Sequence, residues 1–195
     1  MSVFRPGLFK GKVALVTGGG SGIGKAITTE LLTLGCQVVI ASRNMDKLSA
    51  ATNSLKDIGD VQAVQCNIRK EDDVKSVISQ VLKSHGKIDF LVNNGGQFIY
   101  ILQLFVYILK LMSAVCLHFS GGQFPSMTAD MSLKGWNAVI ETNLTGTFLM
   151  SKEIYNQHFK ENGGVITNII ALIDRGFPLM GHTGAARAAV QNLTK

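Results

Sequence analysis

The stretch Thr17-Gly18-Gly19-Gly20-Ser21-Gly22-Ile23-Gly24 decides how this chain folds. It follows a short apolar run that we predict to be a buried strand, and it opens a segment with the length of a helix. Gly18 allows a sharp turn at the strand end, Gly22 allows backbone N–H groups to approach a pyrophosphate, and Gly24 allows close helix packing. A glycine cluster alone is weak evidence, but this strand–turn–helix context favours a dinucleotide-phosphate cradle over an ordinary turn.

On both sides of this stretch, short apolar runs alternate with segments of helical length. We predict strands at residues 13–16, 38–41, 63–65, 90–92 and 165–170. We predict helices at residues 22–34, 46–55, 71–84 and 132–159, and a last helix that starts near Thr183. This alternation is typical of the α/β class, with a doubly wound parallel sheet of the Rossmann type and helices on both faces.

The predicted helix 132–159 has one buried face, formed by residues spaced three and four apart. Its members are Trp136, Val139, Ile140, Asn143, Thr147 and Phe148. Asn143 therefore points inward among apolar neighbours, where its amide must find partners or cost free energy. It either braces the structure or serves a site. The same helix is the candidate contact for a homo-oligomer.

One segment interrupts the alternation. Residues 98–119 are almost entirely apolar, and the tetrapeptide GGQF stands on both sides, at 95–98 and 121–124. We therefore interpret about 97–122 as an insertion into a single domain that spans residues 1–195. The segment has the length of a transmembrane helix, but spanning would separate parts of one sheet domain across a bilayer, so a membrane role is not favoured.

The composition is that of a globular protein of one domain, with 195 residues, 46% apolar residues and a net charge of +6. The cations are scattered, which argues against nucleic acid, while the positive charge suits a phosphate-rich ligand such as NADPH or coenzyme A. Cys36, Cys66 and Cys116 have no disulfide or zinc spacing, and each lies in an apolar stretch, which predicts buried free thiols in a reducing compartment. The first residues lack a signal-peptide core, so secretion is not expected.

The end of the second predicted strand indicates which nicotinamide coenzyme is preferred. An NAD site usually places a carboxylate about 20 residues after the glycines, to accept from the ribose 2′-hydroxyl. This chain has Ala41-Ser42-Arg43 there instead. Arg43 could pair with a 2′-phosphate and Ser42 could donate to it, which favours NADPH. The alternative is an exposed arginine at the start of a helix.

Three motifs together resemble the short-chain dehydrogenase/reductase superfamily. They are the glycine stretch, Asn93-Asn94-Gly95-Gly96 after the fourth strand, and Asn143 within Glu141-Thr142-Asn143-Leu144-Thr145-Gly146. The resemblance implies that Asn94 and Gly95 lie beside the adenine ribose and that Asn143 supports a proton relay. It also places Asn67, followed by Ile68, where the family usually has an aspartate near the adenine.

Within this superfamily, further stretches are similar to the branch that reduces trans-2-enoyl-CoA thioesters in peroxisomes. These are VVIASR, QCNIR, LVNNGG, ETNLTGTF and GFPLMGHTGAARAAVQNLTK. The resemblance implies NADPH-dependent reduction of enoyl-CoA to acyl-CoA in fatty-acid metabolism. It also implies a peroxisomal location, with the cytoplasm as the alternative.

The catalytic residues of the superfamily, a Tyr-x-x-x-Lys pair and a Ser after the fifth strand, are not matched. Ile170 and Ala171 stand where the serine is expected. One register aligns Thr183 and Arg187 with the Tyr and Lys, so that Arg187 could hold the ribose or the enolate oxygen and Thr183 could orient a water. The other register aligns Gln191 and Lys195, and Gln cannot act as an acid. For Thr183 and Arg187, a helix cap and a surface cation are the plain alternatives.

The resemblance also implies a seven-stranded sheet, whereas only five strands are predicted here, so we expect a fold that is incomplete at the C-terminus with an open edge on the fifth strand. Two alternatives to enoyl reduction therefore stay open. One is a catalytically inactive, truncated nucleotide-binding form. The other is a relative that reduces 3-oxoacyl or other carbonyl groups.

Overall fold

The computed structural model describes residues 3–95, 123–171 and 176–195. The whole of the insertion predicted at 97–122 lies outside these residues. The chain divides into two compact units. The sheet unit comprises Met1–Gly95 and Gly146–Ile169, and the helical unit comprises Gly96–Thr145 and Ile170–Lys195. Each unit is described by itself.

The sheet unit is built on a parallel sheet of five strands in the order β3-β2-β1-β4-β5. The strands are β1 (Val13–Thr17), β2 (Gln37–Ser42), β3 (Val61–Gln65), β4 (Phe90–Asn93) and β5 (Val165–Asn168). All five were predicted, although β5 ends before residue 170. Beyond it, the Ile169 N–H still donates to the Asn93 carbonyl oxygen at 2.9 Å.

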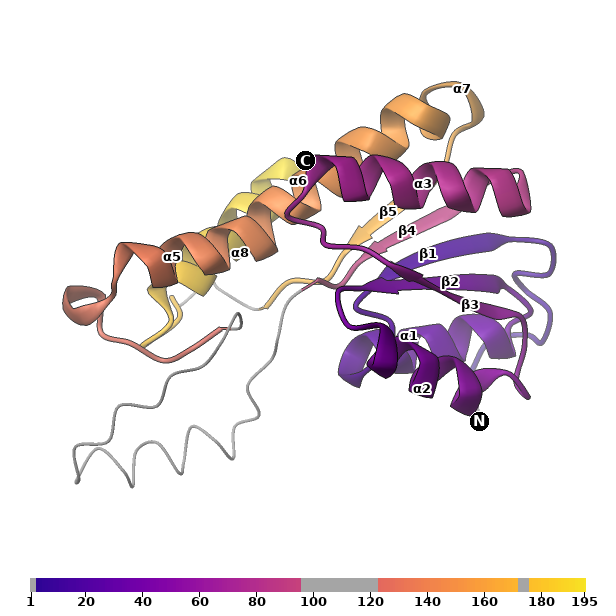
Figure 1. The fold of residues 1–195 in the computed structure, drawn as a ribbon, viewed down its shortest axis with the longest axis horizontal. Helices are drawn as coiled ribbons and strands as arrows, with labels where there is room; N and C mark the ends of the chain where they lie inside the picture. The colour runs from indigo at the N-terminus through magenta and orange to yellow at the C-terminus, as the bar shows by residue number, and fades with distance from the viewer. Residues whose placement is uncertain (1–2, 96–122, 172–175) are drawn as a thin grey trace. The chain divides into compact units, whose positions relative to one another are not determined.

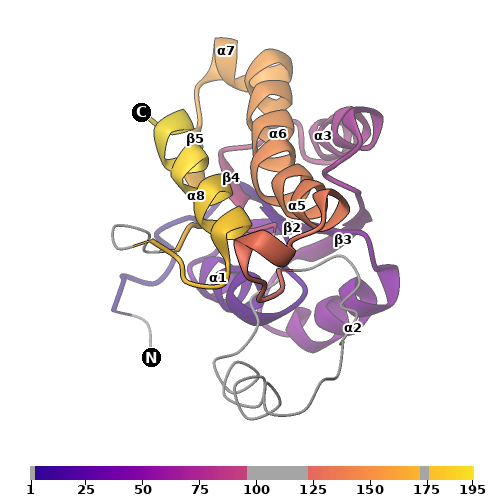
Figure 2. The same ribbon diagram turned by 90° about the vertical axis from the view of Figure 1, so that its left-hand side faces the viewer.

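Helices cover both faces of this sheet (Figures 1 and 2). The helices α1 (Gly22–Thr33) and α2 (Met45–Leu55) lie on one face, and α3 (Glu71–His85) and α6 (Gly146–Ile154) lie on the other. Along β1, Val13 and Leu15 join the core on the α3 side, while Ala14 and Val16 join the core on the α1 side. This alternation is what a strand buried on both faces requires, and the doubly wound α/β class is confirmed.

The predicted long helix forms with two π-helical turns in it. Helical residues run without interruption through α5 (Leu133–Ile140), η2 (Glu141–Thr145), α6, η3 (Tyr155–Phe159) and α7 (Lys160–Asn162). Val139, Asn143 and Thr147 are buried as predicted, but Phe148 is 45% exposed, so that part of the prediction is wrong. The π turn η2 adds about one residue per turn and rotates the following positions, so Leu149 and Met150 face inward instead.

The helical unit contains η1 (Thr128–Asp130), α5, η2 and α8 (Gly181–Leu193). Figure 2 shows α5 and α8 side by side, and the Cα positions of α5 and η2 contact those of α8. The last helix begins two residues before the predicted Thr183. Across residues 3–95, 123–171 and 176–195, no helix combines the length and apolarity needed to cross a bilayer.

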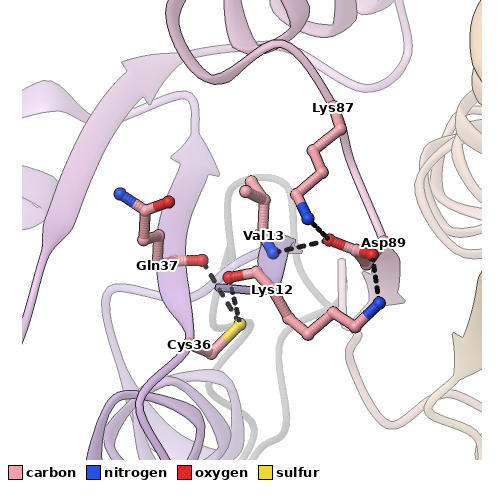
Figure 3. Close-up of polar contacts among 6 residues, drawn as sticks. All are labelled: Lys12, Val13, Cys36, Gln37, Lys87 and Asp89. Carbon is pink, nitrogen blue, oxygen red and sulfur yellow. Dashed lines mark hydrogen bonds and ion pairs between the residues drawn. The ribbon is translucent and has the colours of Figure 1, made fainter. Parts of the chain in front are cut away.

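Asp89 ties the beginnings of two strands together (Figure 3). Its Oδ2 accepts from the Val13 N–H at 2.9 Å, and its Oδ1 accepts from Lys12 Nζ at 2.8 Å. Lys87 Nζ lies 3.5 Å from Oδ2. Partial burial favours the neutral carboxyl, but the hydrogen bonds from Lys12 and Val13 and the charges of both lysines outweigh it, so the pKa of Asp89 lies below its ordinary value.

We expect Asp89→Asn to lower the free energy of unfolding at pH 7 by about 1 kcal/mol, because the ion pairs are lost while an acceptor for Val13 remains. Lys12 and Lys87 are 48% and 44% exposed, so solvent screens both pairs and keeps the effect small. Because the folded-state pKa is lowered, this stabilisation is present above the ordinary carboxyl pKa of about 3.9 and is lost as pH falls through the folded value.

Urea unfolding measured from pH 7 down to pH 3 checks this expectation. The difference between the original chain and Asp89→Asn should shrink as the pH falls. Asp57→Asn, a change at an exposed loop carboxylate, serves as the control. A difference that stays constant across the pH series would contradict an ion-pair origin.

Two of the three cysteines lie in the described residues, and both are buried free thiols, as predicted. Burial, aided by the charge of Asp89, raises the pKa of the Cys36 thiol to about 12. Burial, aided by Asp73, raises the pKa of Cys66 to about 12 as well. Both thiols are therefore protonated and unreactive at neutral pH. Cys116 lies outside the described residues.

Candidate nucleotide-binding site

The glycine stretch forms a tight turn at the carboxyl end of β1. Gly18 has a φ of +67°, and its N–H donates to the Ala41 carbonyl oxygen of β2 at 2.7 Å. This backbone conformation suits glycine, because a Cβ there is sterically strained. The turn is therefore held to the neighbouring strand at its first residue.

Gly24 stands where the first turn of α1 comes closest to this loop. A Cβ built on Gly24 would overlap the Gly18 carbonyl oxygen and the Asn94 side-chain nitrogen. The absence of a side chain therefore sets how near the helix can approach the strand end. This is the close packing that the sequence predicted for the third glycine of the motif.

The amino end of α1 presents its backbone N–H groups without a side-chain cap. Ser21 is the N-cap residue, and its side chain makes no capping hydrogen bond. Gly22 has a φ of +51°, and a Cβ there would meet no atom within 4 Å. Ile23 is 45% exposed beside it. An accessible, uncapped helix start with open space over a glycine fits a dinucleotide diphosphate.

Thr17 and Asn94 brace the turn against β4. The Thr17 hydroxyl donates to the Val92 carbonyl oxygen at 3.3 Å and accepts from the Asn94 N–H at 3.0 Å. The Asn94 side-chain amide donates to the carbonyl oxygens of Thr17 and Gly18, at 3.3 and 3.4 Å. The polar groups of this pair therefore hold the loop in place.

Ile68 fills the space between two glycines on the β4 side. A Cβ on Gly95 or on Gly146 would overlap the Ile68 side chain. The preceding residue, Asn67, has its backbone N–H bonded to Asp73 at 3.0 Å, and its side-chain oxygen accepts from the Arg69 N–H at 3.2 Å. The structure therefore brings Asn67, Ile68 and Gly95 together at the carboxyl end of the sheet.

At the end of β2, Arg43 is exposed and its carbonyl oxygen accepts from the Gln65 side chain at 3.0 Å. The helix cap is the next residue, Asn44, whose side chain accepts from the Lys47 N–H at 2.8 Å. The Ser42 hydroxyl lies 3.4 Å from the Asn44 backbone N–H and carbonyl oxygen. Arg43 thus has no part in capping α2 and lies exposed just after the end of β2, the strand end at which doubly wound dinucleotide sites contact the adenosine ribose.

In the helical unit, Asn143 is 2% exposed and lies in the π turn η2. Its amide nitrogen donates to the Val139 carbonyl oxygen at 3.0 Å, and its oxygen accepts from Gln123 Nε2 at 3.3 Å. Gln123, itself 3% exposed, was missed as a partner. Its place in the second GGQF tetrapeptide was the available signal, but that repeat was used only to mark an insertion.

Three buried polar side chains stand on α8. His182, Thr183 and Arg187 are 0%, 1% and 4% exposed. The N-cap of α8 is Met180, so Thr183 is not the cap, and Arg187 is not a surface cation. Burial lowers the pKa of Arg187. By contrast, Gln191 and Lys195 are exposed, and Lys195 lies past the end of the helix.

His182 was not predicted as a site residue. Its Nδ1 accepts from the Thr183 N–H at 2.9 Å, and its ring meets Phe124 edge-on with centroids 4.7 Å apart. Burial lowers the pKa of His182, although the backbone of Met180 and Phe124 partly opposes this, so the ring is neutral at pH 7. Before the helix, Leu179 adopts a φ of 59°, a strained conformation for a side chain of this size.

These features correspond to a known class of proteins. A family model described as short chain dehydrogenase matches residues 12–195. The chain belongs to this family of oxidoreductases, whose members use NAD(H) or NADP(H).

Individual relatives agree with this assignment. The chain is 32% identical to the peroxisomal 2,4-dienoyl-CoA reductase of Danio rerio, over 99% of its own length and 57% of that protein. Among solved structures, it resembles a citronellol catabolism dehydrogenase (AtuB) of Pseudomonas aeruginosa at 39% identity and a TM-score of 0.83, covering 99% of this chain and 70% of that one. A metagenomic short-chain oxidoreductase in complex with NADP gives 26% identity and a TM-score of 0.77, covering 95% and 74%. The chain thus spans little more than half the length of the curated relative.

Proposed function

We propose that this chain binds NADPH at the glycine turn and reduces the carbon–carbon double bond of a trans-2-enoyl-CoA. The observation that carries the proposal is the uncapped start of α1 over the open space at Gly22. Its position at the carboxyl ends of parallel strands is where doubly wound proteins bind nucleotides. An acyl-CoA substrate is supported by the names of the curated relatives, which act on 2,4-dienoyl-CoA.

On the coenzyme side, the residues divide into two roles. The N–H groups at the start of α1 hold the diphosphate, and Arg43 with Ser42 receives the 2′-phosphate of the adenosine. No Asp or Glu stands between residues 41 and 45 to favour a free 2′-hydroxyl. When bound, the coenzyme supplies a hydride to the β-carbon of the substrate.

On the substrate side, the thioester oxygen gains negative charge as the double bond is reduced, and the α-carbon needs a proton. In the proposal, Arg187 stabilises that oxygen or holds the ribose, Thr183 orients a water that delivers the proton, and Asn143 supports the relay. Lys195 is the candidate of the alternative register, with Gln191 in the tyrosine position. A homo-oligomer through helix 132–159 and a peroxisomal location, after the relatives' names, belong to the same proposal.

A second candidate function is nucleotide binding without turnover. The observation that favours it is the composition of α8, which contains no tyrosine. In one register, the exposed Gln191 takes the tyrosine position of the Tyr-x-x-x-Lys pair. A third candidate function, reduction of 3-oxoacyl groups, is included in the test. This reaction depends most on the missing tyrosine and serine, because a carbonyl oxygen must be protonated directly.

Two measurements on the full chain test these functions. Calorimetry with NADPH and NADH measures coenzyme binding, and NADPH absorbance with crotonyl-CoA, a 2,4-dienoyl-CoA and a 3-oxoacyl-CoA measures turnover. We expect NADPH binding and turnover of crotonyl-CoA, reduced by at least about tenfold in Thr183→Val and unchanged in the control Thr194→Val. Binding without turnover of any substrate would leave the nucleotide-binding function. No binding of either coenzyme would rule out both.

A further inference from the structure

Residues 3–12 lie on the surface of the sheet unit ahead of β1, and we name them the N-terminal strap. The strap is fixed at Phe9, whose N–H donates to the Leu34 carbonyl oxygen at 2.9 Å. The Phe9 ring also packs edge-on against Phe90, with centroids 5.1 Å apart. Gly7 and Gly11, with φ of 72° and 74°, turn the backbone on either side of this anchor. The strap therefore has a defined place on the unit.

The remaining large apolar side chains of the strap face solvent. The exposed fractions are 93% for Val3, 55% for Phe4 and 45% for Leu8. The strap also carries the cations Arg5, Lys10 and Lys12, and it contains no carboxylate. Exposing three apolar side chains to water in so short a segment costs free energy. That cost is removed when the side chains transfer into an apolar phase.

Lys12, the last residue of the strap, lies at the end of the sheet unit where the parallel strands begin (Figure 3). Lys12 joins Gln37 of β2 through its carbonyl oxygen at 2.9 Å and Asp89 through its Nζ at 2.8 Å. Gln37 in turn bonds Asp60 at 2.8 Å, and the Val165 N–H donates to the Asp89 carbonyl oxygen at 3.0 Å. Two more exposed apolar residues therefore lie at the same end of the sheet. The exposed fractions are 43% for Ile58 and 54% for Val165.

We propose that this end of the sheet unit docks peripherally on an anionic lipid surface. The apolar side chains of the strap enter the headgroup region, and Arg5 and Lys10 pair with lipid phosphates and carboxylates. Nucleic acid fits this end less well, because its phosphate backbone would gain nothing from the exposed apolar side chains of Val3 and Leu8. The glycine turn lies at the opposite ends of the strands, so a docked sheet unit keeps that turn away from the lipid.

Co-sedimentation of the full chain with lipid vesicles tests the proposal. One set of vesicles contains phosphatidylcholine alone, and the other contains about 30 mol% phosphatidylserine. We expect binding to the second set only, weakened at roughly 0.5 M salt because the charges are then screened. Arg5→Gln and Lys10→Gln should each lower the partition coefficient by roughly fivefold, and Leu8→Ser with Val3→Ser by roughly tenfold.

The matched control is Tyr155→Ser, which removes an apolar surface side chain that is 53% exposed on the helix run instead of the strap. It should leave vesicle binding unchanged. Thermal unfolding of every variant shows whether the fold is kept, which is expected because all the changed side chains are exposed. Equal binding to both vesicle sets, or equal loss in strap and control variants, would overturn the proposal. The proposal would also be overturned if the chain failed to bind vesicles but did bind a DNA fragment, since this end would then act only as a cationic surface.

Discussion

Replacing Gly24 with alanine is expected to lower the free energy of unfolding by about 3 kcal/mol and to abolish nucleotide binding. The added Cβ overlaps the Gly18 carbonyl oxygen and the Asn94 side chain. Alanine in a helix gains about 1 kcal/mol over glycine, which is too little to offset a clash with backbone. Because Asn94 also holds the turn at Thr17, its side chain cannot move aside for the added Cβ without breaking the brace to β4.

Gly22→Ala is the matched control, because Gly22 lies two residues before Gly24 in the same motif. Its Cβ would meet no atom of the protein, so the cost is only the strain of a φ of +51°, about 1 kcal/mol. Chemical denaturation and NADPH calorimetry on both variants separate the effects. We expect Gly22→Ala to keep most of the stability and to lose affinity, since the methyl group occupies the approach to the helix start. Equal stability losses in the two variants would contradict the packing role of Gly24.

The second large effect concerns coenzyme choice. We expect Arg43→Asp to weaken NADPH binding by about a hundredfold, because charge-assisted hydrogen bonds are replaced by repulsion of the 2′-phosphate. NADH binding should stay unchanged or improve, since a carboxylate at this strand end can accept from a 2′-hydroxyl. Calorimetry with both coenzymes measures the ratio of the two dissociation constants.

Lys160→Asp provides the charge-matched control for this experiment, because it makes the same change of net charge at an exposed position on α7. It should lower the affinity for both coenzymes slightly and equally. Parallel losses for NADPH and NADH in Arg43→Asp would show that this arginine does not read the 2′-phosphate and would leave the NADPH preference without support.

The sheet was predictable because its signals are local. Strands buried on both faces are continuous apolar runs, and the turn at Gly18 is demanded by the glycines themselves. The exposure of Phe148 was not predictable from helical spacing, since the period changes within the five residues of η2. No residue in the sequence marks that change beforehand.

The buried polar residues of the helical unit show a second limit. Asn143 was recognised because it interrupts an apolar stripe, but Gln123 lies 20 residues earlier along the chain and has no periodic context. His182 was passed over because it sits among small residues of α8, where the sequence shows no apolar face for it to join. Side-chain pairs that form only through tertiary packing leave no pattern in one sequence.

The turn after β1 consists largely of glycine, so it contributes almost no side chains to its own support. Its shape is held by the Asn94 amide, which reaches it from the end of β4, and by the Thr17 hydroxyl, which ties the end of β1 to the Val92 carbonyl oxygen. Ligand affinity and the integrity of β4 are therefore linked in a single equilibrium. A coenzyme present at about one hundred times its dissociation constant would raise the free energy of unfolding by roughly 2.7 kcal/mol. Conversely, a change that destabilises β4 would weaken coenzyme binding.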